Sequence, residues 1–168
     1  GYKIIKKIGY GGMGDVYLAE HEVLEKKVAI KSLHKNLASD NSFRERFSHE
    51  AKTHSKLDHP NIVKLLDYRE RKDGLFLIMD YVNGSQLDKY IQNVTGPIPE
   101  NVLIPLFIQI LDAIDYAHKK GLVHRDIKPA NIMIDYEGRI KLLDFGIVKT
   151  EEELGLTKTG DQIGTVTY

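Results

Sequence analysis

The chain has 168 residues, of which 24 are basic and 24 acidic, so its formal net charge is zero. This balance gives no support to a role on nucleic acid or on a membrane surface. The sequence contains no cysteine, which excludes disulfides and thiolate metal sites and agrees with a reducing compartment. A chain of this length can bury roughly 70% of its unfolded surface, and no apolar run is long enough to span a bilayer. We therefore expect a soluble, cytoplasmic protein with a real core, and any membrane anchor would lie outside this segment.

Residues 9–17 read GYGGMGDVY, a glycine spacing that occurs in two kinds of phosphate-binding loop. In dinucleotide-binding folds the loop opens a helix, and an acidic residue follows about twenty positions later. In protein kinases the loop joins two strands above ATP. Here residues 16–19 alternate as in a strand, and Val28, Ala29 and Ile30 stand where the acidic residue would fall. The loop is thus expected to join two strands, which leaves a dinucleotide-dependent oxidoreductase as a remote alternative.

The pattern up to residue 82 predicts five strands and one helix. Apolar residues at helical spacing, with Glu50 and His54 on the same stripe, predict a helix over residues 41–57. A short linker is expected at residues 82–84. The predicted strands are residues 2–8, 16–19, 28–33, 61–68 and 75–81.

The remainder of the chain reads as mainly helical with one hairpin. Ser85 is expected to cap a brief helix over residues 87–91, and a long helical pattern ends at Gly121. Because proline in mid-helix costs about 3 kcal/mol, Pro105 predicts that this helix is regular only from about its own position, with Asn101 as cap. Residues 132–134 and 140–143 form the predicted hairpin, and the composition after residue 146 is typical of a loop.

Glu50 is the first candidate for chemistry, because a carboxylate on the apolar side of a helix is costly unless it has a partner. For a lone glutamate the ordinary interpretation is a side chain at the edge of the stripe that reaches water. Lys31 shares one face of its strand with Ala29 and is a suitable partner. Its presence upstream favours an ion pair between Lys31 and Glu50.

Two further segments place polar residues between apolar runs. In HRDIKPAN, residues 124–131, Asp126 can take or orient a hydroxyl proton, Lys128 can hold a phosphoryl group and Asn131 can offer oxygen to a metal ion. In LLDFG, residues 142–146, Asp144 follows an apolar strand and would share a magnesium ion with Asn131. Either segment alone is also typical of an ordinary turn in which Asp and Asn cap backbone groups.

Together and in this order, the motifs resemble those of the eukaryotic-like (Hanks-type) serine/threonine protein kinases, bacterial branch. The resemblance covers the whole chain. Lys128 is typical of the serine/threonine branch, and Met13 within GGMG is typical of its bacterial members. The matching segments are the glycine loop with Val16, the strand Val28-Ala29-Ile30-Lys31, Glu50, the HRD-x-K-x-x-N loop and Asp144-Phe145-Gly146.

The resemblance implies an α+β, protein-kinase-like fold: a five-stranded antiparallel N-lobe with one main helix in residues 1–82, and the first part of a mainly helical C-lobe in residues 83–168. It implies an enzyme that transfers the γ-phosphoryl group of ATP to Ser/Thr hydroxyls of protein substrates, with Mg²⁺, or alternatively Mn²⁺, as the metal ion. Since the chain ends at Tyr168, before the Ala/Ser-Pro-Glu motif, the kinase domain is expected to be truncated. The alternative function is a nucleotide-binding, catalytically impaired fragment or scaffold module.

The resemblance also assigns roles to single residues. It makes Asp126, Lys128, Lys31, Glu50 and Thr165 catalytic, with Thr165 hydrogen-bonding Asp126 and Lys128. Asn131 and Asp144 become the metal ligands. The residues implied to bind ATP are Ile8, Gly9, Gly11, Gly12, Met13, Gly14, Val16, Ala29, Lys31, Met79, Asp80, Val82 and Met133.

Two features concern regulation. Arg125 precedes Asp126 as in kinases that are activated by phosphorylation, since its guanidinium can pair with a phosphate. Thr157 and Thr159 are the expected phosphoacceptors, and a dimer would allow autophosphorylation in trans. His54 stands where an apolar residue is usual in the family, which predicts a looser or pH-sensitive contact with the region of Phe145.

Overall fold

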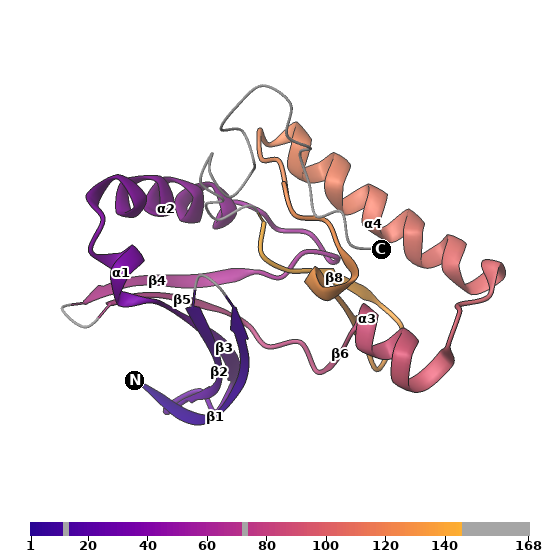
Figure 1. The fold of residues 1–168 in the computed structure, drawn as a ribbon, viewed down its shortest axis with the longest axis horizontal. Coiled ribbons are helices and arrows are strands. Elements are labelled where there is room, and N and C mark those ends of the chain that lie inside the picture. The colour runs from indigo at the N-terminus through magenta and orange to yellow at the C-terminus, as the bar shows by residue number, and fades with distance from the viewer. Residues whose placement is uncertain (12–13, 72–73, 146–168) are drawn as a thin grey trace. The chain divides into compact units, whose positions relative to one another are not determined.

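The computed structural model describes residues 1–11, 14–71 and 74–145 (Figure 1). The chain forms two compact units. The first contains residues 1–58 and 63–82, and the second contains residues 59–62 together with the chain from residue 83 onward. The segment 59–62 thus groups with the second unit although it follows the main helix of the first. The assignment of residues 1–82 and 83–168 to two kinase lobes stays a prediction.

The first unit is built on a five-stranded antiparallel sheet in the order β1-β2-β3-β5-β4. This confirms the predicted sheet, with changes at the strand ends. The strand predicted at 61–68 begins only at Leu65, because residues 59–62 belong to the other unit. The strands are β1 Tyr2–Gly11, β2 Gly14–His21, β3 Lys27–Leu33, β4 Leu65–Arg71 and β5 Gly74–Asp80.

One face of this sheet packs an apolar cluster. Ala19, Val28, Ile30 and Ile78 are buried there, and the partly buried Tyr2 and Phe76 pack against them. Side chains alternate between the faces of a strand, so neighbouring positions such as Ala29 and Lys31 point to the opposite face. The opposite face carries the predicted nucleotide residues together with the buried Leu18 and Leu77.

Two helices accompany the sheet: α1 Lys35–Ala38 and α2 Asn41–His54. The carboxylate of Asp40 caps α2 by accepting hydrogen bonds from the backbone N–H groups of Ser42 at 2.8 Å and Phe43 at 3.1 Å. The helix lies alongside β4 (Figure 1), where the rings of Phe47 and Tyr68 are 5.9 Å apart. It ends at His54 rather than at Leu57.

The second unit contains a three-stranded antiparallel sheet, β6-β7-β8, made of Gly84–Gln86, Ile132–Asp135 and Ile140–Leu142. The β7–β8 hairpin confirms the prediction, whereas the predicted linker at residue 84 is in fact part of β6. The short helices are α3 Leu87–Tyr90, a π-helix at Ile91–Thr95 and a 3-10 helix at Pro129–Asn131. Gln86, not Ser85, occupies the N-cap of α3, because Ser85 pairs with Ile134.

The long helix α4 runs from Glu100 to Lys119, so the prediction of a regular helix only from Pro105 is wrong. Pro105 is the sixth residue of the helix, where it removes a single backbone hydrogen bond. The N-cap is Pro99 rather than Asn101. The predicted end is confirmed: Gly121 has a φ of 78°, its N–H donates to His118, and the N–H of Leu122 donates to Ala117.

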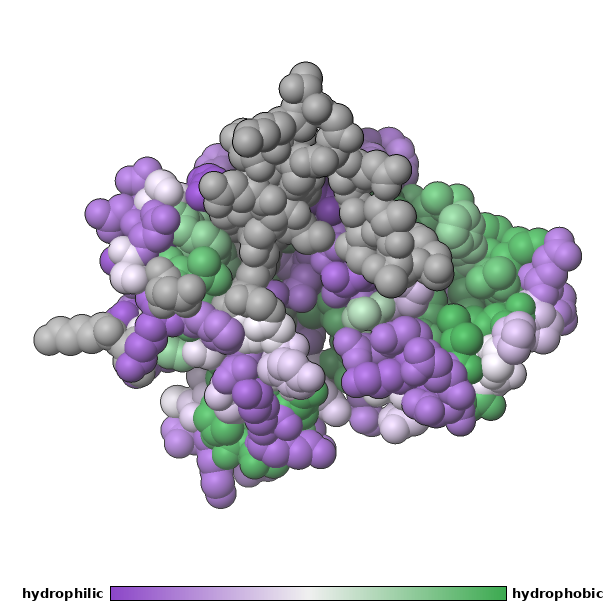
Figure 2. All heavy atoms as spheres, viewed as in Figure 1, coloured by the Kyte–Doolittle hydropathy of each residue, from purple (hydrophilic) through white to green (hydrophobic). Residues whose placement is uncertain are grey.

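Helix α4 carries apolar residues on more than one side. Its buried residues are Leu106, Ile110, Ala113 and Ala117, whereas Leu103, Phe107 and Leu111 are exposed. Figure 2 shows the exposed hydrophobic surface over this helix. Its exposed apolar side chains are Val102, Leu103, Ile104, Phe107, Ile108 and Leu111. Monomeric proteins rarely leave a large contiguous apolar patch exposed.

Gly14 begins β2 at a point where no side chain fits. A Cβ on Gly14 would overlap the carbonyl oxygen of Ser32 on the neighbouring strand β3, whereas a Cβ on Gly11 would meet no atom within 4 Å. The two glycines face each other in the β1–β2 pairing. They therefore form a matched pair for substitution.

We expect Gly14→Ala to lower the free energy of unfolding of the first unit by about 1–3 kcal/mol, because β2 and β3 must move apart. Gly11→Ala is the control and should change it by less than about 0.5 kcal/mol. Denaturant unfolding followed by circular dichroism measures both. Equal destabilisation by the two variants would contradict the close approach at Gly14.

Candidate functional site

The predicted nucleotide-binding residues of the first unit share one face of its sheet. Val16 pairs with Lys31 across β2 and β3, and Ala29 pairs with Met79 across β3 and β5. Directly opposed residues point to the same face of a sheet, and Ala29 and Lys31 are two positions apart on one strand. The face therefore presents small or apolar side chains beside one lysine, whose side chain is largely buried.

The remaining predicted ATP contacts of this unit lie at the ends of its strands. Gly9 pairs with Val16, and the side chain of Ile8 is 40% exposed beside it. The backbone N–H of Asp80 donates to the carbonyl of Lys64 at 3.0 Å, so it is not available to a ligand. Gly12 and Met13 lie outside the described residues.

Glu50 lies on α2 with its side chain half-buried, and its prospective partner Lys31 lies on β3 of the same unit. His54 follows one turn later and is buried, with its Nε2–H donating to the carbonyl of Val63 at 3.0 Å. An apolar residue is usual at this position in the family. Here the position is filled by the His54 ring, whose Nε2–H is hydrogen-bonded to the backbone.

The second unit brings three predicted residues of the HRDIKPAN segment together. The Nζ of Lys128 is 2.9 Å from Oδ2 of Asp126. The Nδ2 of Asn131 donates to the same oxygen at 2.8 Å and to the backbone carbonyl of Asp126 at 2.9 Å. A lysine and an amide thus hold one carboxylate, whose side chain is 17% exposed. The carboxylate keeps access to solvent and its orientation is fixed.

His124 ties this loop to the LLDFG segment. Its Nε2–H donates to the carbonyl of Leu143 at 2.7 Å, and its Nδ1 accepts from the backbone N–H of Asp126 at 3.3 Å. These bonds require the neutral ring with its proton on Nε2. Burial lowers the pKa of His124, opposed by the hydrogen bond to Leu143 and by the charges of Asp144 and Asp126. The ring also packs on Phe145, with centroids 4.7 Å apart.

Two candidate residues have a left-handed backbone. Arg125 has a φ of 62° and Asp144 a φ of 45°, a backbone region that residues other than glycine rarely adopt. Such a conformation costs about 1–3 kcal/mol and persists only where the surroundings impose it. Here Leu143, directly before Asp144, is held on both sides, since its N–H donates to the carbonyl of Asn131 at 2.9 Å and its carbonyl accepts from His124.

The side-chain oxygens of Asn131 and Asp144 are suitable ligands for a magnesium ion. Both N–H groups of Asn131 bond to Asp126, which turns Oδ1 of its planar amide away from that carboxylate. Asp144 supplies a carboxylate from the adjoining segment. Mg²⁺ typically takes one or two protein oxygens and completes its shell with water and substrate phosphates. Within the described ranges no three His, Cys, Asp or Glu residues form a metal cluster.

Comparison with known proteins identifies the family. The model of the protein kinase domain matches residues 2–168. The chain belongs to the protein kinase family. Serine/threonine-protein kinase PrkC of Bacillus subtilis is 45% identical over 167 residues, which are 99% of this chain and 26% of that protein. Probable serine/threonine-protein kinase PknB of Lactococcus lactis is 40% identical over 168 residues, 99% of this chain and 27% of that protein. The predicted bacterial Hanks-type branch is therefore confirmed.

Solved structures agree with this assignment. The kinase domain of Mycobacterium tuberculosis PknI superposes with a TM-score of 0.78 at 35% identity, covering 89% of this chain and 59% of that one. The fold is thus that of a protein kinase, and the chain spans about a quarter of the two curated relatives named above. Among the described residues, no helix of this kinase chain is long and apolar enough to cross a membrane.

Sequence reasoning missed two polar residues beside the site. Asn61 is 8% exposed and donates from Nδ2 to Oε1 of Gln109 and to the carbonyl of Ile140, both at 2.8 Å. Gln109 lies on α4 between the buried Leu106 and Ile110. A polar side chain within an apolar helix face requires a partner, and this was the signal that the sequence contained.

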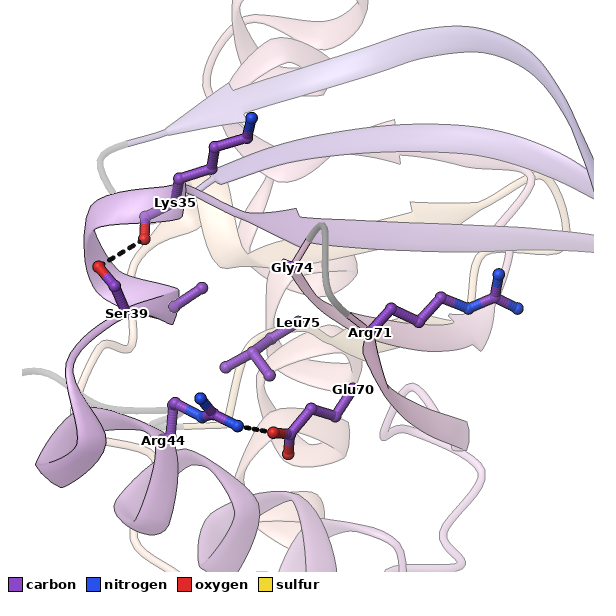
Figure 3. Close-up of a pocket in the computed structure, with 8 residues that line it drawn as sticks. Lys35, Ser39, Arg44, Glu70, Arg71, Gly74 and Leu75 are labelled. Atoms are coloured by element: carbon purple, nitrogen blue, oxygen red, sulfur yellow. Dashed lines mark hydrogen bonds and ion pairs between the residues drawn. The ribbon is translucent and has the colours of Figure 1, made fainter.

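A cavity of about 760 Å³ lies elsewhere in the first unit, between α1, α2 and the β4–β5 hairpin (Figure 3). Arg44 and Glu70 pair across it, while the side chains of Lys35 and Arg71 extend away from that pair. None of the predicted site residues that the structure describes lines it. Its lining consists of Lys35, Ala38, Ser39, Arg44, Glu70, Arg71, Gly74 and Leu75.

The buried ring of His124 predicts that the stability of the folded chain depends on pH. Its pKa is lowered from 6.5 in the folded chain, so the unfolded chain takes up a proton first as the pH falls. Folding stability is therefore lost as the pH drops through about 6.5 towards the lower folded value.

We expect His124→Gln to lessen this loss, because glutamine keeps an N–H for Leu143 and does not titrate. The wild-type melting temperature should fall by a few degrees more than that of the variant between about pH 7.5 and about pH 5. Scanning calorimetry at both pH values provides the comparison. Parallel pH profiles would show that His124 is not the group responsible.

Proposed function

We propose that this chain is the nucleotide-binding and catalytic part of an ATP-dependent serine/threonine protein kinase. The observation that carries the proposal is the cluster of Asp126, Lys128 and Asn131, in which the carbonyl of Asn131 accepts from the N–H of Leu143, the residue before Asp144. A carboxylate, a cation and Asn131, one of the two proposed metal ligands, thus share one hydrogen-bonded unit that adjoins Asp144, the other. Phosphoryl transfer requires this combination, because its catalysis is mostly positioning and charge stabilisation.

The first unit would hold the nucleotide. Adenine would contact the apolar face around Val16 and Ala29, with Ile8 at its edge and Met79 at the back. The backbone carbonyl of Asp80 and backbone groups of Val82 would meet its polar edge, and Met133 is a further proposed contact. Backbone N–H groups of the glycine loop, residues 9–14, would cover the phosphates. Lys31 would bind the α- and β-phosphates, and Glu50 would keep Lys31 in place.

The second unit would carry out the transfer. The hydroxyl of the substrate serine or threonine would donate a hydrogen bond to Asp126, which takes up the proton as the oxygen attacks the γ-phosphorus. Lys128 would pair with the γ-phosphate oxygens and steady the transferring group. Asn131 and Asp144 would hold a divalent cation, Mg²⁺ or Mn²⁺, whose charge when bound offsets the negative charge on the phosphates. The bond from γ-phosphorus to the bridging oxygen breaks, and ADP leaves.

Regulation would act through residues that lie mostly outside the described part of the chain. Thr157 and Thr159 are the proposed phosphoacceptors, and a phosphate on either could pair with Arg125. Thr165 is proposed to hydrogen-bond Asp126 and Lys128. Protein substrates, a dimer for autophosphorylation in trans and a cytoplasmic location complete the proposal.

A second candidate is a nucleotide-binding module that does not transfer phosphate. It is favoured by the exposed apolar side of α4, which includes Phe107 and Ile108. The two candidates differ in turnover and not in binding of Mg·ATP.

Lys31→Met and Asp126→Asn should each lower phosphotransfer by a factor of about 10² or more, because each removes a charge used in the transition state. Lys27→Met is the matched control, since Lys27 is exposed on the same strand as Lys31. Transfer of labelled phosphate from ATP to a generic protein substrate such as casein provides the measurement. Activity that is unaffected by either site variant would rule out the proposed mechanism.

Incubation with Mg·ATP should place phosphate on Thr157, Thr159 or both. Mass spectrometry of tryptic peptides locates the sites, and the Asp126→Asn variant provides the control that should remain unmodified. Phosphate found only at other residues, or present equally in the control, would contradict autophosphorylation at these threonines.

A further inference from the structure

We propose that Asn61 and Gln109 are positioning residues for the metal ligands Asn131 and Asp144, acting through the outer edge of strand β8. The inference rests on the proposed function for the role of those two ligands. Neither Asn61 nor Gln109 would touch nucleotide, metal ion or substrate. Their effect would come from a chain of hydrogen bonds, each of which lies within the second unit.

The first step is the edge of β8. This strand has β7 on one side only, with Ile140 opposite Ile134 and Leu142 opposite Ile132. In an antiparallel pair, alternate residues direct their backbone groups away from the partner strand. Ile140 and Leu142 direct theirs away from β7, so these groups need partners elsewhere because both residues are fully buried.

Asn61 and Gln109 supply those partners. The N–H of Ile140 donates to Oε1 of Gln109 at 3.0 Å, and its carbonyl accepts from Nδ2 of Asn61 at 2.8 Å. The N–H of Leu142 donates to the backbone carbonyl of Asn61 at 2.8 Å. Oε1 of Gln109 also accepts from Nδ2 of Asn61, so the two side chains hold each other. Together they fix β8 along its length.

The second step leads from β8 to the ligands. Leu143 directly follows the strand, and its N–H donates to the carbonyl of Asn131 at 2.9 Å. Asp144 comes next, in the left-handed conformation that its surroundings must impose. A shift of β8 along its axis would therefore move Asp144 relative to Asn131. The spacing of the two ligands depends on a strand whose outer edge is held by the side chains of Asn61 and Gln109 and by the backbone of residues 61–62.

The expected consequence concerns metal dependence in particular. Loss of the Gln109 acceptor leaves the N–H of Ile140 buried and unsatisfied, which loosens β8. We expect the free Mg²⁺ concentration for half-maximal binding of a non-hydrolysable ATP analogue to rise about tenfold. Binding of the same analogue in EDTA should not change, since neither Asn61 nor Gln109 would contact the nucleotide.

The test compares Gln109→Met with Gln109→Glu in the natural protein that contains residues 1–168. Methionine has a similar size and no acceptor oxygen, whereas glutamate keeps an oxygen for both donors. Asn61→Ala is a second probe, which changes no residue of α4. It should raise the Mg²⁺ requirement as much as Gln109→Met does. Calorimetric titration of the analogue at graded Mg²⁺ gives the affinities, and amide hydrogen exchange at Leu142 and Leu143 reports the hold on β8.

The proposal is supported if Gln109→Met and Asn61→Ala raise the Mg²⁺ requirement and speed exchange at Leu142 and Leu143, while Gln109→Glu resembles the wild type. It is overturned if they lower the melting temperature without moving the Mg²⁺ requirement, or if glutamate has the same effect as methionine. If the wild-type protein binds Mg·nucleotide but does not transfer phosphate, the proposed function is wrong, whereas this inference is unaffected. If either Gln109→Met or Asn61→Ala does not fold, the Mg²⁺ requirement and the hydrogen exchange of the remaining variant test the proposal.

Discussion

The hydrogen bond from His124 to the carbonyl of Leu143, 2.7 Å long, joins the two halves of the candidate site. The HRDIKPAN loop and the LLDFG segment are separate in sequence, and each alone could be an ordinary turn. The imidazole closes them into one unit, because its other nitrogen accepts from the N–H of Asp126. Only a neutral ring can do both, and burial, which lowers the pKa of His124, keeps it neutral. The positions of Asp126 and Asp144 both depend on this contact.

Much of the fold could be predicted from periodicity. The alternation of residues 28–33 identified β3, and the turn residues between 135 and 138 identified the β7–β8 hairpin. The errors arose where tertiary contacts override local preference. Residues 61–64 are rich in strand formers, yet Asn61 uses its side chain and carbonyl on β8. Pro105 was expected to delay α4, but near the start of a helix it costs one hydrogen bond rather than a turn.

The candidate site was predicted from motifs, and the described residues bring Asp126, Lys128 and Asn131 within hydrogen-bonding distance. A sequence motif carries no information on the residues elsewhere in the chain that hold it in position. Asn61 and Gln109 are 48 positions apart and meet only when the chain is folded. No local pattern encodes such a pair, although a glutamine between Leu106 and Ile110 was a warning that α4 had a polar partner. Support of this kind can be recognised only from coordinates.

The covered edge of β8 also bears on how the protein behaves in concentrated solution. A strand edge with open N–H and C=O groups is a template on which another chain can add a strand, and this is a common route to aggregation. At β8 the N–H and carbonyl of Ile140 and the N–H of Leu142 are already occupied by Asn61 and Gln109. An amide side chain cannot propagate a ladder as a strand does. The same few bonds that steady β8 therefore also close it to foreign strands.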